Sequence, residues 1–136
     1  MRRLSLCLAF ALLLIAPPRA ALAQEAEIQN TIRSQIDAFL ADDFVTAFTY
    51  ASPNIRAVFG NPENFARMVT QGYPMVHRPR EVTMGEMHDE GGVLWQRVEV
   101  TDAQGRPHVL DYQMVNTPEG WKINAVDVLR AEGLGV

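Results

Sequence analysis

Cysteine is almost missing from this sequence. The chain has 136 residues and a single cysteine, Cys7, which lies in an apolar stretch near the N-terminus. Disulfide frameworks, cysteine-based zinc sites and thiol chemistry all need cysteine side chains. These classes are therefore excluded for the part of the chain that follows Cys7.

Positive charge is also scarce. The chain carries 12 basic and 16 acidic residues, a net charge of −4. Nucleic-acid-binding domains display a basic patch, and proteins held on anionic lipid carry a polybasic cluster. The composition therefore predicts no nucleic-acid partner and no electrostatic attachment to a membrane.

Only one long apolar run is present, over residues 4–15. About a dozen residues are too few for a membrane-spanning helix, which needs about 20. The run has the surroundings of a secretory signal: Arg2 and Arg3 before it, Pro17 and Pro18 after it, and Ala21-Leu22-Ala23 ahead of Gln24. We therefore predict a signal peptide over residues 1–23, cleaved before Gln24, and a periplasmic or secreted product. An uncleaved N-terminal anchor is the alternative.

The remaining residues, 24–136, are predicted to form a single domain without a stable membrane anchor. Loss of Arg2, Arg3 and Arg19 with the signal removes three positive charges, which takes the net charge from −4 to −7. Cys7 is lost as well. A domain of this length buries enough apolar surface to fold without disulfides.

Motifs that define a reaction are missing too. The sequence has no glycine-rich phosphate loop, no nucleophile elbow and no zinc-binding helix motif. Its three histidines, His77, His88 and His108, do not have the spacing of metal ligands. We predict neither a metal site nor a cofactor.

The first half of the chain has the pattern of helices. Ile28, Ile32, Ile36, Phe39 and Leu40 form one apolar stripe on a helix from about residue 25 to 41. Three further helices are expected after residues that can cap them. Asp42-Asp43 precedes a helix with Phe44, Ala47, Phe48 and Ala51, Ser52-Pro53 starts a short helix, and Asn61-Pro62 starts a longer one that ends at Gly72.

The second half alternates with a period of two. Strands are expected over residues 81–88, 93–101, 108–116 and 121–129, separated by turn clusters rich in Gly, Asp and Pro. Helices followed by strands joined through short turns indicate an α+β fold with N-terminal helices on an antiparallel meander. Three of the strands are apolar on both faces, so we expect a second subunit to cover part of the face that the helices leave open. Cover by the C-terminal segment 130–136 of the same chain is the alternative.

The order of elements and several short segments resemble a known family. The segment GWKI at residues 120–123 is similar to the closing strand of the nuclear transport factor 2-like, or SnoaL-like, cone superfamily. The segments FTYASPNIRAVFG at 48–60, FARMV at 65–69, GYPMV at 72–76 and WQRV at 95–98 resemble, more narrowly, the bacterial domain of unknown function 4864 family. The resemblance implies a curved sheet that forms a cone, and it implies no particular activity.

Cones of this superfamily often hold a pocket between helices and sheet, so the resemblance directs attention to residues that could line one. The candidates are Tyr50, Tyr73, His77, Asp111 and Tyr112. Tyr73 belongs to a proline-flanked segment that we expect to be extended and to cross the cone mouth. Asp111 in mid-strand could serve as a base beside a tyrosine, or it could face solvent or pair with Arg97 on the neighbouring strand.

Two functions follow as hypotheses. The absence of a recognisable catalytic pair favours a non-enzymatic module that binds a small apolar ligand or a protein partner. The alternative is a small pocket enzyme of the isomerase or dehydratase type, in which Asp111 acts with a tyrosine. The inward or outward direction of Asp111 distinguishes the two.

Overall fold

The computed structural model describes residues 19–129. Five helices come first: α1 (Arg19–Leu40), α2 (Phe44–Thr49), α3 (Pro53–Phe59), α4 (Pro62–Gly72) and α5 (Pro74–His77). Four strands follow: β1 (Glu81–Glu90), β2 (Val93–Thr101), β3 (Pro107–Thr117) and β4 (Gly120–Leu129). Most of the predicted signal peptide and the last seven residues lie outside the described residues. The predicted α+β class is confirmed.

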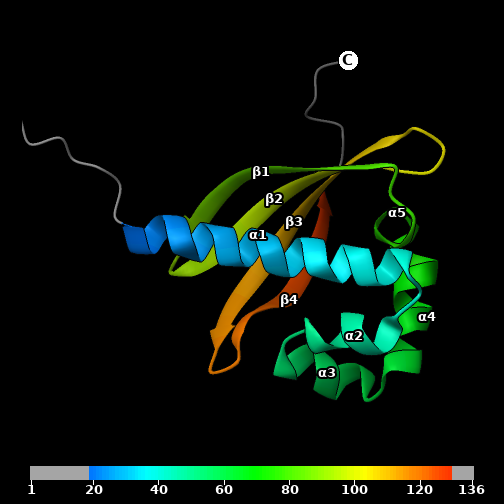
Figure 1. Ribbon diagram of the computed structural model, residues 1–136, viewed down its shortest axis with the longest axis horizontal. Coiled ribbons are helices and arrows are strands. Elements are labelled where there is room, and N and C mark those ends of the chain that lie inside the picture. Colours follow the sequence, from blue (N-terminus) through cyan, green and yellow to red (C-terminus); the bar gives the residue numbers. More distant parts are fainter. Residues whose placement is uncertain (1–18, 130–136) are drawn as a thin grey trace, which may run out of the picture.

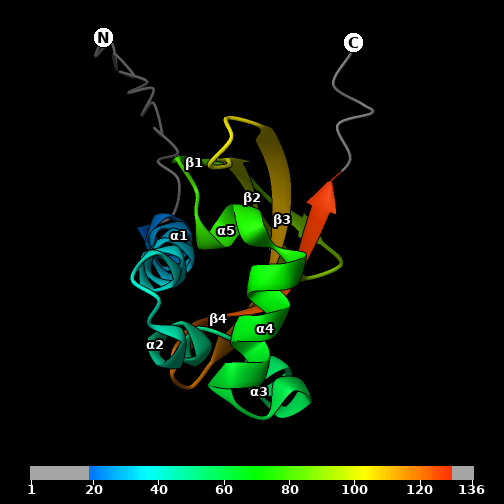
Figure 2. The same ribbon diagram turned by 90° about the vertical axis from the view of Figure 1, so that its right-hand side faces the viewer.

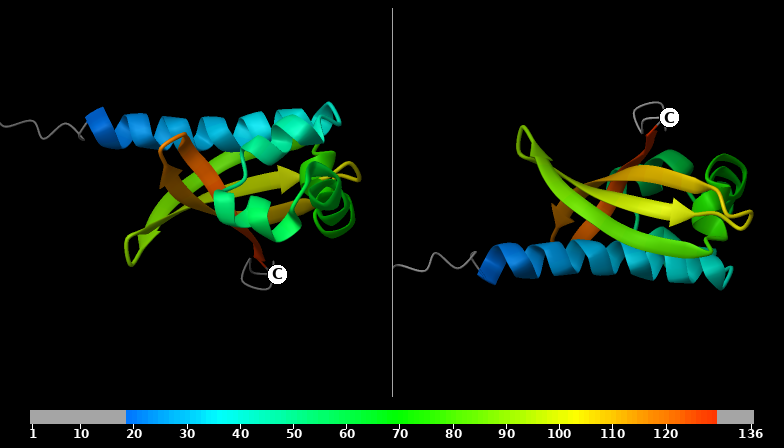
Figure 3. Two further views of the ribbon diagram at one scale, coloured as in Figure 1. Left: turned by 90° about the horizontal axis from the view of Figure 1, so that it is seen from below. Right: turned by 90° about the horizontal axis from the view of Figure 1, so that it is seen from above.

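The strands form one antiparallel sheet in the order β1-β2-β3-β4. Figure 1 shows the long helix α1 crossing one face of the sheet, with α2 and α3 below its C-terminal half and α4 beside its C-terminal end. In Figure 2, α1 is seen end-on, with α5 beside it and α4 farther away. Figure 3 shows that the sheet is strongly curved, with α1 along its side. We call the side of the sheet that faces the helices the inner face and the opposite side the outer face.

The core lies between the helices and the inner face. Ile28, Ile32 and Phe39 of α1 are at most 1% exposed, and they belong to the same buried cluster as Val98 and Leu110 of the sheet. Full burial of such a side chain stabilises the fold by about 1.5–3 kcal/mol. The isoleucine stripe that marks α1 in the sequence is therefore what fixes this helix on the sheet.

The short helices start where the capping residues predicted them. Asp43, Ser52 and Asn61 each accept a hydrogen bond from a backbone N–H in the first turn, at 3.1, 3.2 and 2.8 Å. Each bond satisfies a donor that has no partner within its own helix.

Several boundaries differ from those predicted. α1 begins at Arg19, inside the segment expected to be cleaved, and Leu40 is 46% exposed because Phe39 occupies the inward position at the end of that helix. α2 ends at Thr49, so Ala51 lies in the connection to α3. The segment Pro74–His77 is helical rather than extended, since proline is well suited to a first helical position.

The outer face is mixed in character. Its residues include Trp95 and Arg97 on β2, which pair in register with Gln113 and Asp111 on β3. The predicted apolar side chains are therefore interrupted by charged and amide groups. Cover by a second subunit remains a prediction.

Candidate functional site

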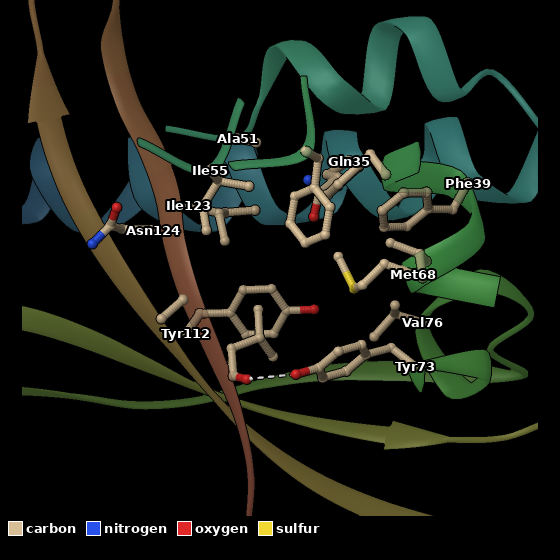
Figure 4. Close-up of a pocket in the computed structure, with 15 residues that line it drawn as sticks. Gln35, Phe39, Ala51, Ile55, Met68, Tyr73, Val76, Tyr112, Ile123 and Asn124 are labelled. Carbon is tan, nitrogen blue, oxygen red and sulfur yellow. Dashed lines mark hydrogen bonds between the residues drawn. The ribbon is translucent and has the colours of Figure 1, made fainter. Parts of the chain in front are cut away.

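A cavity of about 310 Å³ lies between the helices and the inner face. That is roughly twice the volume of the engineered apolar cavity that holds one benzene ring. Its walls come from α1, α3, α4, α5, β3 and β4, and most of its lining is apolar: Phe39, Ile55, Phe59, Phe65, Met68, Val69, Val76, Ile123 and Val126. Figure 4 shows these elements surrounding the space.

Backbone hydrogen bonds between β4 and the connection from α2 to α3 form one wall of the cavity. Ser52 N donates to Ile123 O at 2.8 Å, and Ile123 N donates to Tyr50 O at 2.9 Å, so the connection between α2 and α3 pairs with the strand. At this point the β3–β4 register shifts. The extra residue is Asn124, whose side-chain oxygen accepts from Ser52 Oγ at 2.7 Å. The bulge thus turns β4 towards α3 and leaves room for the cavity.

No charged side chain is found among the described residues that line the cavity. The lining residues with polar side chains are Gln35, Tyr73, Tyr112 and Asn124, and the amide of Asn124 points away from the cavity (Figure 4). Two of them are fully engaged. The Tyr73 hydroxyl donates to Val126 O at 3.2 Å, and the Asn124 amide donates to Gln113 Oε1 at 2.7 Å while its oxygen accepts from Ser52.

The other two polar side chains, Tyr112 and Gln35, have unused hydrogen-bonding groups. Within the described part of the chain, the Tyr112 hydroxyl makes no hydrogen bond, although the residue is only 1% exposed. Burial raises the pKa of Tyr112 well above its usual value, and the nearby Tyr73 adds to the rise, so the hydroxyl stays protonated. Gln35 Nε2 donates to Ala47 O at 3.2 Å, which leaves the amide oxygen free.

Of the five residues predicted to line a pocket, the structure brings two together in this cavity, Tyr73 and Tyr112. Tyr50 lies at the end of α2, with Lys122 Nζ 5.8 Å from its ring centre. His77 packs against Phe44. Both lie outside this cavity, and His77 lines the second groove described below.

Asp111 is also outside the cavity, because neighbouring residues of a strand point to opposite faces of the sheet. Tyr112 points inward, so Asp111 points to the outer face. There its Oδ2 lies 2.9 Å from His88 Nε2 and 3.7 Å from Arg97 Nη2. The pairing of Asp111 with Arg97, one of the arrangements considered from the sequence, is therefore present, with His88 as a second partner. Asp111 and Tyr112 therefore face opposite sides of the sheet, which disfavours a joint role of these two residues on one ligand.

A second, polar groove of about 390 Å³ lies beside α5 and the β2–β3 turn. Its basic side chains have acidic partners close by. The carboxylate oxygens of Asp42 lie 2.8 Å from His77 Nε2 and 2.8 Å from Arg78 Nη2. Asp102 Oδ2 lies 2.9 Å from His108 Nε2 and 3.1 Å from Arg106 Nε. The hydrogen bond from His108, aided by backbone N–H groups of Arg106 and Gln104, lowers the pKa of Asp102 far below its usual value.

Metal ligands do not gather in the described part of the chain, where no group of three or more His, Cys, Asp or Glu side chains could hold an ion. No helix among residues 19–129 is long and apolar enough to cross a membrane.

Sequence reasoning missed Gln35. A signal for it exists, since position 35 lies three residues after Ile32 and next to Ile36, on the buried side of α1. A polar residue on such a stripe either finds a partner in the core or faces a cavity. Gln35 does both.

Comparison with known proteins confirms the predicted family. A family model described as Domain of unknown function (DUF4864) matches residues 21–136, and the chain belongs to that family. No curated protein matches the chain in sequence. One solved structure, an NTF-2-like protein of unknown function from Burkholderia xenovorans LB400, is similar at 16% identity and a TM-score of 0.46, over 82% of this chain and 91% of that one.

Proposed function

We propose that this protein binds a small, uncharged, largely apolar molecule in the cavity between α1, α4 and β4. The observation that carries the proposal is the cavity itself: about 310 Å³ of space with an apolar lining and, in the described residues, no charged side chain. Ligand sites are typically concave and apolar, with a few placed polar groups.

The energetics favour such a ligand. Removal of apolar surface from water is worth about 25 cal/mol per Å², so a two-ring ligand that buries roughly 200 Å² gains about 5 kcal/mol before the loss of its free motion is subtracted. A carboxylate or ammonium group would lose its hydration with no opposite charge to replace it, at a cost of several kcal/mol. The cavity therefore discriminates strongly against charged molecules.

Binding is favoured over acid–base catalysis because of where the carboxylate lies. The isomerase or dehydratase hypothesis needs Asp111 beside a tyrosine, and the sheet separates Asp111 from Tyr112 and from the cavity. The tyrosine hydroxyl that does face the cavity stays protonated and so is no base.

We also propose that the protein works outside the cytoplasm. The supporting features are in the sequence: the short apolar run after Arg2 and Arg3, and the small residues ahead of Gln24.

The proposal is tested with naphthalene and 2-naphthoate as a neutral and a charged probe of similar size. Protein expressed from the full chain should bind naphthalene and reject 2-naphthoate in calorimetric titrations. Met68 points into the cavity from α4, so Met68→Trp should fill the space and abolish binding (Figure 4). Val45→Trp, at a site that is 64% exposed on α2, is the matched control and should bind normally. Absence of naphthalene binding, or equal binding by Met68→Trp, would refute the proposal.

A further inference from the structure

One hydroxyl and one amide oxygen in the cavity make no hydrogen bond to the described residues, and they can serve a ligand as donor and acceptor. The donor is the Tyr112 hydroxyl on β3, and the acceptor is the Gln35 amide oxygen on α1. Figure 4 shows the Tyr112 ring reaching from the sheet with its hydroxyl in the middle of the cavity, and Gln35 on the opposite wall. From this pair we infer that the ligand is a compact apolar alcohol or phenol, whose hydroxyl group Tyr112 and Gln35 bind together. The inference rests on the proposed function.

Tyr112 is the stronger part of the argument. A buried polar group normally has a partner, and one without a partner is costly to the fold. Tyr112 is 1% exposed and lines the cavity, and a phenylalanine would fill the same place in the core at lower cost. Its hydroxyl stays protonated at ordinary pH and can therefore donate to a ligand oxygen.

Gln35 is held in one orientation. Its amide group reaches the carbonyl oxygen of Ala47, and only the nitrogen end can donate to a carbonyl. The oxygen end must then be the one that remains free. Gln35 as a whole is 4% exposed and lines the cavity, so this acceptor is available to a ligand there.

A hydroxyl group is the complement of this pair, because it donates one hydrogen bond and accepts others. Its hydrogen would go to Gln35 Oε1, and its oxygen would accept from Tyr112. A ketone or an ether could accept from Tyr112 only and would leave Gln35 unpaired. A carboxylate would bring its charge against the Gln35 oxygen.

The other polar side chains of the cavity do not compete for this role. Tyr73 donates to the edge strand at Val126 O, and both ends of the Asn124 amide are occupied. Specificity for the polar group of the ligand is therefore assigned to two residues, which can be tested separately.

The test compares 2-naphthol with 2-methylnaphthalene, which have the same shape and differ in hydrogen bonding. In an apolar cavity without partners, 2-naphthol would bind roughly tenfold or more weakly, because its hydroxyl loses water and gains nothing. With Tyr112 and Gln35 as partners, 2-naphthol should bind at least as tightly as 2-methylnaphthalene. Calorimetric titration of protein from the full chain measures both.

Variants then assign the effect. Tyr112→Phe and Gln35→Met should each weaken 2-naphthol by about three- to tenfold, the worth of one neutral hydrogen bond, and leave 2-methylnaphthalene unchanged. Tyr73→Phe is the control and should not alter the ratio of the two affinities. The probe comparison needs no variant, so it decides the question even where Gln35→Met fails to fold.

The outcomes separate this inference from the proposed function. Failure of both probes to bind would refute the cavity as a ligand site. Normal binding of 2-methylnaphthalene with 2-naphthol tenfold weaker would leave the cavity in place and overturn the alcohol inference. A 2-naphthol affinity that neither variant changes would also overturn it.

Discussion

Replacement of Tyr112 by phenylalanine should stabilise the ligand-free protein. In most proteins the loss of a buried tyrosine hydroxyl is destabilising, because the hydroxyl has a hydrogen-bond partner that is left unpaired. Here no partner is present among the described residues, and the ring sits in the core with Leu110 and Met114. Tyr112→Phe keeps the ring contacts and removes only the unpaired group.

The magnitude follows from the cost of such a group. A buried donor or acceptor without a partner destabilises a fold by about 1–3 kcal/mol. The Tyr112 hydroxyl faces a cavity that water can enter, which reduces this cost. We therefore expect the variant to gain about 1 kcal/mol in the free energy of unfolding, a shift of a few degrees in melting temperature for a domain of this size.

Tyr73→Phe is the matched comparison. Its hydroxyl donates to Val126 O at 3.2 Å and joins the end of α4 to the edge strand. Loss of that bond should cost about 0.5–1.5 kcal/mol. Urea unfolding of the two variants and the unmodified protein, with the slopes compared, measures both changes. Destabilisation of Tyr112→Phe to the same extent as Tyr73→Phe would show that the Tyr112 hydroxyl has a partner, and the reasoning about the cavity would fail.

Four further predictions concern the rest of the chain. In urea unfolding, Asn61→Ala should lower the free energy of unfolding by about 1 kcal/mol and Ser52→Ala by about 2 kcal/mol, because Ser52 also bonds to Asn124 of β4. Equal effects would contradict a stabilising role of that hydrogen bond. Because the folded-state pKa of Asp102 is lowered, this carboxylate should stabilise the fold above about pH 4, and the stabilisation should be lost as the pH falls further. In a plot of the urea unfolding midpoint against pH, Asp102→Asn should therefore reduce the fall at acid pH. An unchanged curve would be evidence against this. The intact mass of the exported protein should begin at Gln24; a full-length chain in that fraction would argue against cleavage. Sedimentation equilibrium should show a homodimer joined through the outer face, and a clean monomer at micromolar concentration would end that expectation.

The fold could be predicted well because its signals are local. The isoleucine stripe of α1, the capping residues Ser52 and Asn61, and the period-two strands each report the structure of their own neighbourhood. Errors arose where a local signal is ambiguous. Pro74 is compatible both with an extended segment and with the first turn of a helix. The packing of α5 against the neighbouring helices decides between the two.

The site could be predicted only in part, because a cavity is a product of packing between distant segments. Tyr112 and Tyr73 were found as polar-tipped aromatic residues, but so was Tyr50, and nothing in the sequence separates the three. The bulge at Asn124, which shapes one wall, has no clear mark in the sequence either. Gln35 is marked only as a polar residue on an apolar stripe, a pattern that is equally typical of a glutamine with a partner in the core.

The neighbours Asp111 and Tyr112 give the sheet two separate roles. Both are buried residues of β3, and they face opposite sides. Tyr112 places its hydroxyl in an apolar cavity, where it has no hydrogen-bond partner among the described residues. Asp111 points to the outer face, with His88 and Arg97 beside it. Had the strand register been shifted by one residue, the carboxylate would face the cavity and the pocket enzyme would be the better hypothesis. The register observed places Tyr112 on the inner face and Asp111 on the outer face, and it favours the proposed binding of neutral molecules over the pocket enzyme.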